Sequence, residues 1–201
     1  MRLIKGLIMA IGVIGILVIV ALLTGFYLYS LSPPIQTKMI KPQLSEKDAQ
    51  SFEQKLDSLD AQIKAAVEAR EKRNVDLVIT EPEINSKLAN VLAEGQLPLE
   101  KIWINFGDGY FLTYAVVEAP VINAKTGTIG RIEITDGKPK VVIDDFNLGK
   151  LPLPESAKAR VEQLVNIMVS LQMSDVPVDI TSVQIKDHQL TVAGTTKTGE
   201  K

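Results

Sequence analysis

Histidine and paired acidic residues are the first candidates for chemistry in this chain. The only histidine, His188, lies in a short polar stretch between two apolar runs, where a solvent-exposed turn is expected. A lone histidine is a poor metal site. Asp144 and Asp145 are neighbours in a predicted strand, so their side chains point to opposite faces and cannot readily act on one bond. These residue types therefore predict no catalytic residue and no metal site.

Known catalytic signatures are also missing from the sequence. It contains no G-x-S-x-G, phosphate-binding loop, H-E-x-x-H or dinucleotide fingerprint, and no cysteine that could act as a thiolate. The formal net charge of -2 gives no basic excess for nucleic acid. We therefore expect a protein that is not an enzyme, needs no cofactor and binds no nucleic acid. Hydrolysis of an envelope polymer is a third-ranked alternative.

Apolar side chains are the stronger candidates for a binding role. The run from Tyr110 to Ala119, YFLTYAVVEA, carries apolar residues at both odd and even positions of a predicted strand. A sheet that is apolar on both sides must be covered twice or enclose something. Core packing explains most of the aromatic residues in this hairpin, and the alternatives are an apolar groove or a surface that faces the membrane or a partner.

The segment NLGKLPLPES, residues 147–156, is the second apolar feature. Each leucine precedes a proline, which favours an extended backbone, and each proline fixes its own dihedral angle. The two leucines either fill the core where a strand meets a helix or line the mouth of an apolar cavity. The residues that we expect to line such a cavity are Leu112, Tyr114, Leu151, Leu153, Leu164 and Met168.

The amino-terminal segment predicts a membrane anchor. Leu7 to Leu31 carries no charge, and about 20 apolar residues already span a hydrocarbon layer as a helix. The length and the lack of an A-x-A cleavage pattern favour a retained single-pass anchor over a cleaved signal peptide. Arg2 and Lys5 favour a cytoplasmic amino terminus, which would place the remaining chain on the extracytoplasmic side of the cell membrane.

Periodicity and capping signals predict the elements that follow the anchor. We expect helices over 45–73, 80–95 and 155–173, the second with a capping box of Thr80 and Glu83 and the third with an apolar stripe that includes Leu164 and Met168. Strands are expected over 75–80, 101–106, 110–120, 128–134, 138–148, 176–185 and 189–194. Short turns such as Asp136-Gly137 favour antiparallel pairing.

The fold class that follows is α+β. An N-terminal transmembrane helix precedes one mostly antiparallel curved sheet packed with about three helices. The expected divisions are the cytoplasmic N-terminus and anchor at 1–31, a juxtamembrane linker at 32–44, the extracytoplasmic domain at 45–195 and a flexible tail at 196–201. The linker, SPPIQTKMIKP over 32–42, contains three prolines and is expected to be extended.

Three stretches carry a resemblance to a known family: TEPEIN after a strand, GKLPLP before a helix, and the closing VPVDITSVQIKDHQLTVAG. With them the chain resembles the YpmS-like family of single-pass bacterial membrane proteins. It is more distantly similar to phospholipid-binding proteins of the tubular lipid-binding type. The second likeness implies a lipid ligand. We therefore expect a tethered domain that binds lipid or another apolar ligand. The alternative is a scaffold that binds an envelope protein through helix 45–73 or a sheet edge.

Overall fold

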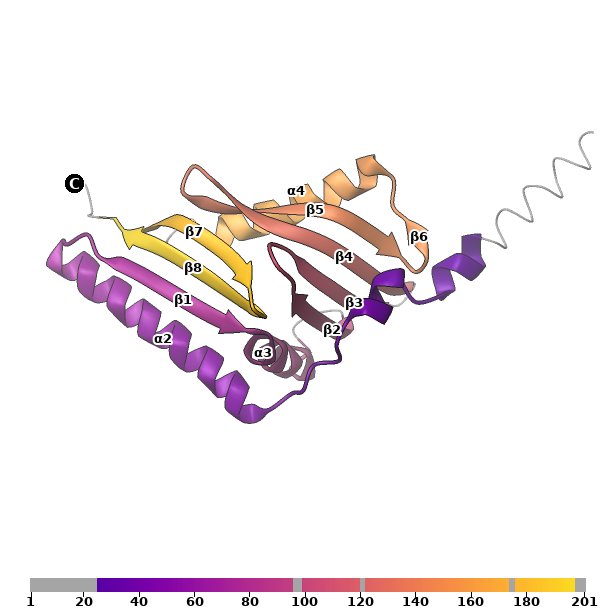
Figure 1. Ribbon diagram of the computed structural model, residues 1–201, viewed down its shortest axis with the longest axis horizontal. Helices are drawn as coiled ribbons and strands as arrows, with labels where there is room; N and C mark the ends of the chain where they lie inside the picture. The colour runs from indigo at the N-terminus through magenta and orange to yellow at the C-terminus, as the bar shows by residue number, and fades with distance from the viewer. Residues whose placement is uncertain (1–24, 96–98, 120–121, 174–175, 198–201) are drawn as a thin grey trace, which may run out of the picture.

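A computed structural model describes residues 25–95, 99–119, 122–173 and 176–197 of the chain. From residue 45 onward the order of helices and strands agrees with the predicted order, apart from the added two-residue strand β6 (Figure 1). The helices are η1 (Pro34–Lys38), α2 (Glu46–Ala69), α3 (Glu81–Ala93) and α4 (Glu155–Met173). The strands are β1 (Asn74–Thr80), β2 (Leu99–Phe106), β3 (Phe111–Ala119), β4 (Ile122–Thr135), β5 (Lys138–Leu148), β6 (Leu151–Pro152), β7 (Val178–Lys186) and β8 (Gln189–Thr196).

The described strands form two antiparallel sheets, a three-stranded one in the order β1-β8-β7 and a five-stranded one in the order β2-β3-β4-β5-β6. The mixed α+β class and the antiparallel pairing are confirmed. The expectation of one sheet is wrong, because α3 starts directly after β1 and its side chains occupy the free edge of β2. Backbone hydrogen bonds still join the sheets at their turns, from Gly109 N–H to the Ile185 carbonyl and from Ile180 N–H to the Gly137 carbonyl.

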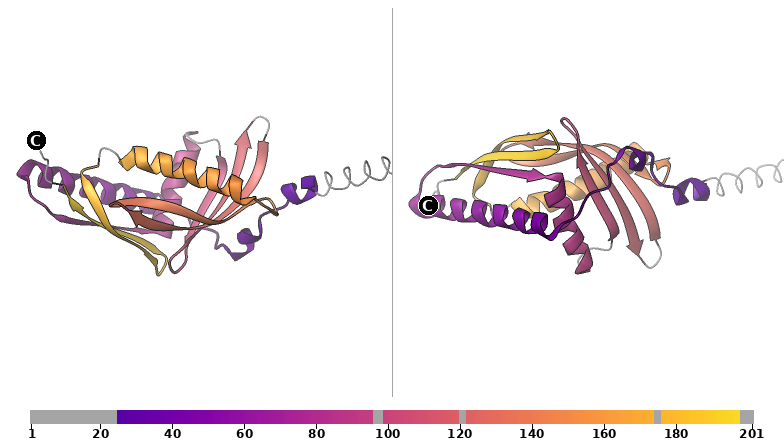
Figure 2. Two further views of the ribbon diagram at one scale, coloured as in Figure 1. Left: turned by 90° about the horizontal axis from the view of Figure 1, so that it is seen from above. Right: turned by 60° about the horizontal axis from the view of Figure 1, so that its bottom comes forward.

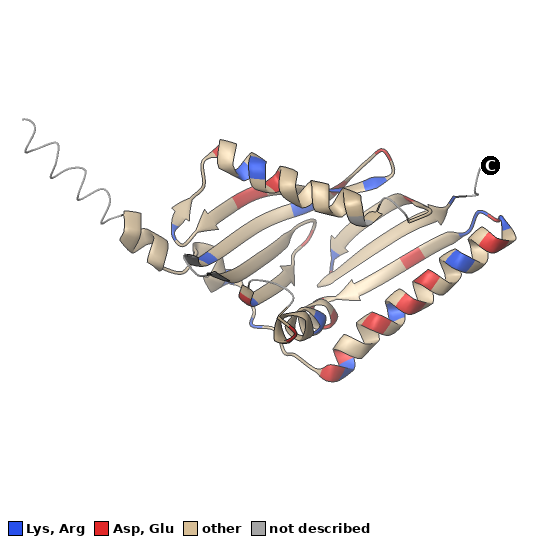
Figure 3. Cartoon of the chain, turned by 180° about the vertical axis from the view of Figure 1, so that it is seen from behind, with Lys and Arg blue, Asp and Glu red and all other residues tan. Residues whose placement is uncertain are grey.

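Helix α2 packs on the three-stranded sheet, and a hydrophobic core lies between them. It begins after Ser45, whose hydroxyl accepts the Asp48 N–H at 3.0 Å, and its C-cap is Arg70, three residues before the predicted end. Ile63 and Ala66 are buried, and Ile63 packs with residues of β1 and β7. Its opposite side is densely charged (Figure 3). The helix therefore packs on its own domain, as the narrow apolar stripe predicts.

A buried carboxylate connects α2 with α3. Glu83 accepts hydrogen bonds from Ser51 at 2.6 Å, from Lys55 at 2.8 Å and from the N–H of Thr80 at 2.9 Å. Burial alone raises the pKa of Glu83, but these hydrogen bonds outweigh burial and lower that pKa to about 2. The predicted capping box of Thr80 and Glu83 is thereby confirmed, and the same carboxylate links α3 to Ser51 and Lys55 of α2.

The segment predicted as an extended linker packs on the five-stranded sheet instead. It contains the 3-10 helix η1, which starts at Pro34. Pro33 and Ile35 are buried over Gly127, where a Cβ would overlap with both side chains. The Ile40 N–H donates to Asn105 Oδ1 at 2.9 Å. Because an apolar residue fits over the glycine, the segment bends onto the sheet.

The two ends of the described chain bear on the predicted divisions. Within that part of the chain, no helix is both long and apolar enough to cross a membrane. Most of the predicted span, Leu7–Leu31, lies outside the described residues, which begin at Gly25. At the other end, β8 runs to Thr196, the first residue of the predicted tail, which is fully buried and accepts the Arg73 N–H. Residues 198–201 of that tail lie outside the described part.

Candidate functional site: an apolar face bordered by helix α4

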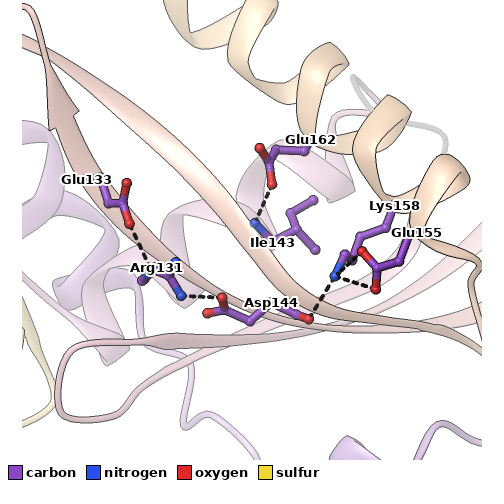
Figure 4. A network of polar contacts seen from close by, with 7 residues as sticks. All are labelled: Arg131, Glu133, Ile143, Asp144, Glu155, Lys158 and Glu162. Carbon is purple, nitrogen blue, oxygen red and sulfur yellow. Dashed lines mark hydrogen bonds and ion pairs between the residues drawn. The ribbon is translucent and has the colours of Figure 1, made fainter.

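Polar side chains hold α4 along the edge of β5. Asn166 accepts the Val141 N–H at 2.8 Å and donates to the Val141 carbonyl at 2.7 Å. Glu162 accepts the Ile143 N–H at 2.9 Å (Figure 4). Strand β6 pairs with only two residues of β5, Asn147 and Leu148, so these side chains take the place of a neighbouring strand along the rest of the edge.

The spacing of the two side chains explains why a helix can do this. Residues four apart rise about 6 Å along a helix, and two residues of a strand advance about 6.6 Å. Glu162 and Asn166 are four apart, and the backbone groups that they meet are two apart. Lys158, one turn earlier, continues the row and donates to the Asp144 carbonyl at 3.2 Å, at a bulge in β5 (Figure 4).

Helix α3 repeats this arrangement at the opposite edge of the same sheet. Asn85 accepts the Ile104 N–H at 2.8 Å and donates to the Ile104 carbonyl at 2.7 Å. Glu81 accepts the Phe106 N–H. In each helix the asparagine also donates to the backbone carbonyl of its own glutamate, at 2.8 Å in α3 and 3.0 Å in α4. The pattern E-x-x-x-N, EPEIN in α3 and EQLVN in α4, therefore closes both edges.

Because the polar side of α4 faces the sheet, its apolar stripe faces away. Residues on the stripe lie nearly opposite Glu162 around the helix. The exposed fractions are 60% for Leu164, 47% for Ile167, 58% for Met168 and 69% for Leu171. Side chains of this size on one side of a helix are normally covered. The stripe is therefore an unusual surface.

The face of the five-stranded sheet that borders α4 is also apolar. Figure 3 shows this face, on the side away from η1; α4 runs along one border, α3 lies at the other, and no helix of the described residues crosses the strands between them. Its side chains alternate with those under η1 and are mostly half-buried. They include Ile102, Ile104, Phe111, Val117, Ile132, Val141, Phe146 and Leu148. We call this surface, together with the exposed stripe of α4, the apolar face.

An open pocket of about 490 Å³ lies where this face meets the three-stranded sheet. Ile132 of β4 contributes to its wall, together with Val183 and Ile185 of β7. Figure 2 shows the two sheets twisted relative to one another. Asp108, Gln184 and Lys186 also line the pocket, so the surface becomes mixed apolar and polar where it meets the second sheet.

The structure does not gather the six predicted lining residues in one place. Leu112 and Tyr114 lie on the η1 side of the sheet, because Tyr114 pairs with Gly127, which η1 covers. Tyr114 is only 3% exposed and its ring centroid lies 5.4 Å from that of Trp103. These two residues therefore belong to the packing under η1.

The other four predicted residues lie on or near the apolar face. Leu151 pairs with Leu148 and so points to the side opposite Tyr114, and Leu153 is half-buried beside it. Leu164 and Met168 form the middle of the exposed stripe. Sequence reasoning missed Ile167 and the half-buried strand residues. Glu162 and Asn166, four apart, mark the side of α4 that faces the sheet, but their spacing alone does not distinguish that side from one that faces solvent.

The polar residues that we considered first have structural partners. His188 lies in the β7–β8 turn, as predicted, and its Nδ1 is 3.0 Å from Glu81 Oε1. That hydrogen bond raises the pKa of His188 above its ordinary value. The Asp144 carboxylate pairs with Arg131, which also binds Glu133 (Figure 4).

Comparison of the chain with models of known families gave no match. Comparison with curated proteins gave no significant match either. The resemblance to the YpmS-like family therefore stays a prediction from the sequence.

Proposed function

We propose that this chain is a membrane-anchored, extracytoplasmic protein without enzymatic activity that binds a lipid acyl chain, or another apolar ligand, on the apolar face. The observation that carries the proposal is the exposed stripe of α4, where Leu164, Met168 and Leu171 are each more than half exposed. Single exposed aliphatic residues are common on protein surfaces, but a contiguous patch marks an interaction site.

The energetics favour an extended apolar ligand. Full burial of a methylene group contributes about 0.8 kcal/mol, so a chain of ten methylenes gains at most about 8 kcal/mol before ordering costs, and less where one side of the chain stays in water. The helix that carries the stripe is already fixed to β5 through Glu162 and Asn166, so it loses little freedom when a ligand binds.

The same geometry disfavours one form of the scaffold alternative. A partner that adds a strand needs free backbone groups at a sheet edge. Side chains from α4 and α3 already bind both backbone groups of Val141 in β5 and of Ile104 in β2. They also bind the N–H groups of Ile143 and Phe106. The outer side of α2 is charged (Figure 3), which suits solvent better than a tightly packed partner.

Lipid analysis of the purified domain tests the proposal. The chain from Ser32 onward would be expressed without the predicted anchor, purified without detergent and extracted for mass spectrometry. We expect a bound glycerophospholipid or fatty acid in the unaltered domain and its loss in the double variant Leu164→Gln/Met168→Gln. The matched control is Leu56→Gln on α2, at a leucine that is 39% exposed and remote from the apolar face. Absence of lipid from the unaltered domain contradicts the proposal, and a stoichiometric protein partner in its place supports the scaffold alternative.

A further inference from the structure

The β5–β6 turn contacts the end of the predicted anchor. The Lys150 N–H donates to the Leu28 carbonyl at 2.8 Å. Gly149 has a φ of 59°, and a Cβ at this position would overlap with the carbonyl oxygen of Tyr29. The Gly149 N–H donates to the Lys125 carbonyl at 2.7 Å, which ties the turn to β4. This part of GKLPLP is thus shaped to receive another stretch of backbone.

Little free chain separates that contact from the sheet. Residues 25–30 are helical, and the buried Pro33 follows the helix after only Leu31 and Ser32. Ile35 is 4% exposed and η1 lies on β3 and β4. A helix that ends at residue 30 is therefore held against the domain at two places, the β5–β6 turn and η1.

We propose that the domain stands on the membrane in one fixed orientation, with the Gly149–Lys150 turn at the level of the lipid headgroups. The inference rests on the part of the proposed function that takes Leu7–Leu31 as a membrane anchor. The described residues begin at Gly25, in the short helix whose Leu28 carbonyl meets this turn. Phe26 and Tyr27 are 73% and 62% exposed, and tyrosine is enriched at headgroup level.

The charges near the turn fit phosphate-bearing headgroups. The side chain of Lys150 is exposed on the turn, and Lys125 Nζ lies 3.5 Å from Ser32 Oγ. Ammonium groups at a membrane surface attract anionic lipids. Figure 1 places β6 and the start of α4 at the same end of the molecule as residues 25–30, and the end of α2 at the opposite end. The apolar stripe would therefore begin close to the bilayer that supplies its ligand.

Spin-label accessibility in the full chain tests the orientation. The chain has no cysteine, so Lys150→Cys and Lys72→Cys each give a unique labelling site. Lys150 meets Leu28 through its backbone N–H, so replacing its side chain leaves that hydrogen bond intact. Lys72 is exposed and follows α2 at the far end. In vesicles of phosphatidylcholine, with and without phosphatidylglycerol, we expect accessibility to a water-soluble nickel chelate to be several-fold lower at position 150 than at position 72.

A second variant separates fixed docking from simple tethering. Gly149→Ala, combined with a four-residue Gly-Ser insertion between Ser32 and Pro33, should raise the accessibility at 150 to that at 72. Circular dichroism checks that the sheets remain folded. Equal accessibility at the two positions in the otherwise unmodified chain overturns the inference, and so does protection at 150 that survives the combined variant. Failure of lipid binding with intact protection at 150 would count against the apolar-face proposal alone.

Discussion

Replacing Asn85 with alanine would measure how much the hydrogen bonds from α3 to the edge of β2 stabilise the protein. The substitution removes the partner of the Ile104 N–H and the shorter of two hydrogen bonds to the Ile104 carbonyl, which keeps the Asn105 side-chain amide as a donor at 3.2 Å. Asn85 is only 1% exposed, so water cannot readily take over the hydrogen bonds of its side chain. Leaving a buried polar group unsatisfied costs about 1–3 kcal/mol, so the full cost for the N–H and part of that cost for the carbonyl predict a loss of about 2–4 kcal/mol in the free energy of unfolding.

The corresponding change on α4 provides an internal comparison. Asn166 makes the same pair of hydrogen bonds to Val141, but both residues are only half-buried. Water can reach the freed groups, so Asn166→Ala should cost about 1–2 kcal/mol. Gln163→Ala, an exposed position on α4, is the control and should change stability by less than about 0.5 kcal/mol.

Urea unfolding followed by tryptophan fluorescence measures these differences. Trp103 is the only tryptophan and precedes Ile104 on β2, so it reports on the affected edge directly. A common slope against urea would show that the variants unfold in the same transition. If Asn85→Ala costs no more than Asn166→Ala, the reasoning from burial and edge satisfaction is refuted.

Three further predictions concern titration and the exposed stripe. The pKa of Glu83 is about 2, against an ordinary 4.5. The stabilisation that this ionised carboxylate provides above pH 4.5 should therefore be lost as the pH falls toward 2, and the loss should reach about 3 kcal/mol. In urea titrations at several pH values, Glu83→Gln should show a smaller loss over the same range. Because its pKa is raised, His188 should titrate above pH 6.5 in proton NMR, and its titration midpoint should return toward 6.5 in Glu81→Gln. The stabilisation from this contact is present below pH 6.5 and should be lost as the pH rises through the pKa of the folded state. An unchanged titration midpoint in Glu81→Gln would contradict the contact. Leu164→Gln and Met168→Gln should each leave the urea midpoint nearly unchanged, since both side chains are already more than half exposed, and a large destabilisation would mean that the stripe is part of the core.

Local signals in the sequence predicted the elements well. The capping box of Thr80 and Glu83 located the start of α3, and Asp136-Gly137 located the β4–β5 turn, with a positive φ at both residues. Helix α4 spans Glu155–Met173, as predicted. Each of these signals acts within a few residues, so each can be recognised without knowledge of the tertiary fold.

Long-range arrangements could not be predicted in the same way. The closure of β2 depends on side chains of α3 that are about 20 residues distant in the sequence, and no local pattern distinguishes an asparagine that pairs with a strand from one that faces solvent. Packing of the linker required the match between Ile35 and Gly127, which are 92 positions apart (127 − 35).

The candidate site shows the same limit. An apolar stripe on α4 was evident from spacing, but the sequence could not tell that its polar side would face the sheet. Leu112 and Tyr114 were placed with Leu151 because all are apolar, whereas strand register puts them on opposite sides of the sheet. Which face of a strand is covered depends on what packs over it, here η1 on one side.

Site mapping with a photoreactive phospholipid tests the central claim most directly. The full chain would be reconstituted in vesicles that contain a phospholipid with a diazirine near the end of one acyl chain, irradiated, digested with trypsin and analysed by tandem mass spectrometry. The account predicts adducts within the tryptic peptide Val161–Lys186, concentrated on Leu164, Met168 and Leu171 and diminished by Leu164→Gln/Met168→Gln. Adducts confined to residues 1–31, with none on α4, would contradict it.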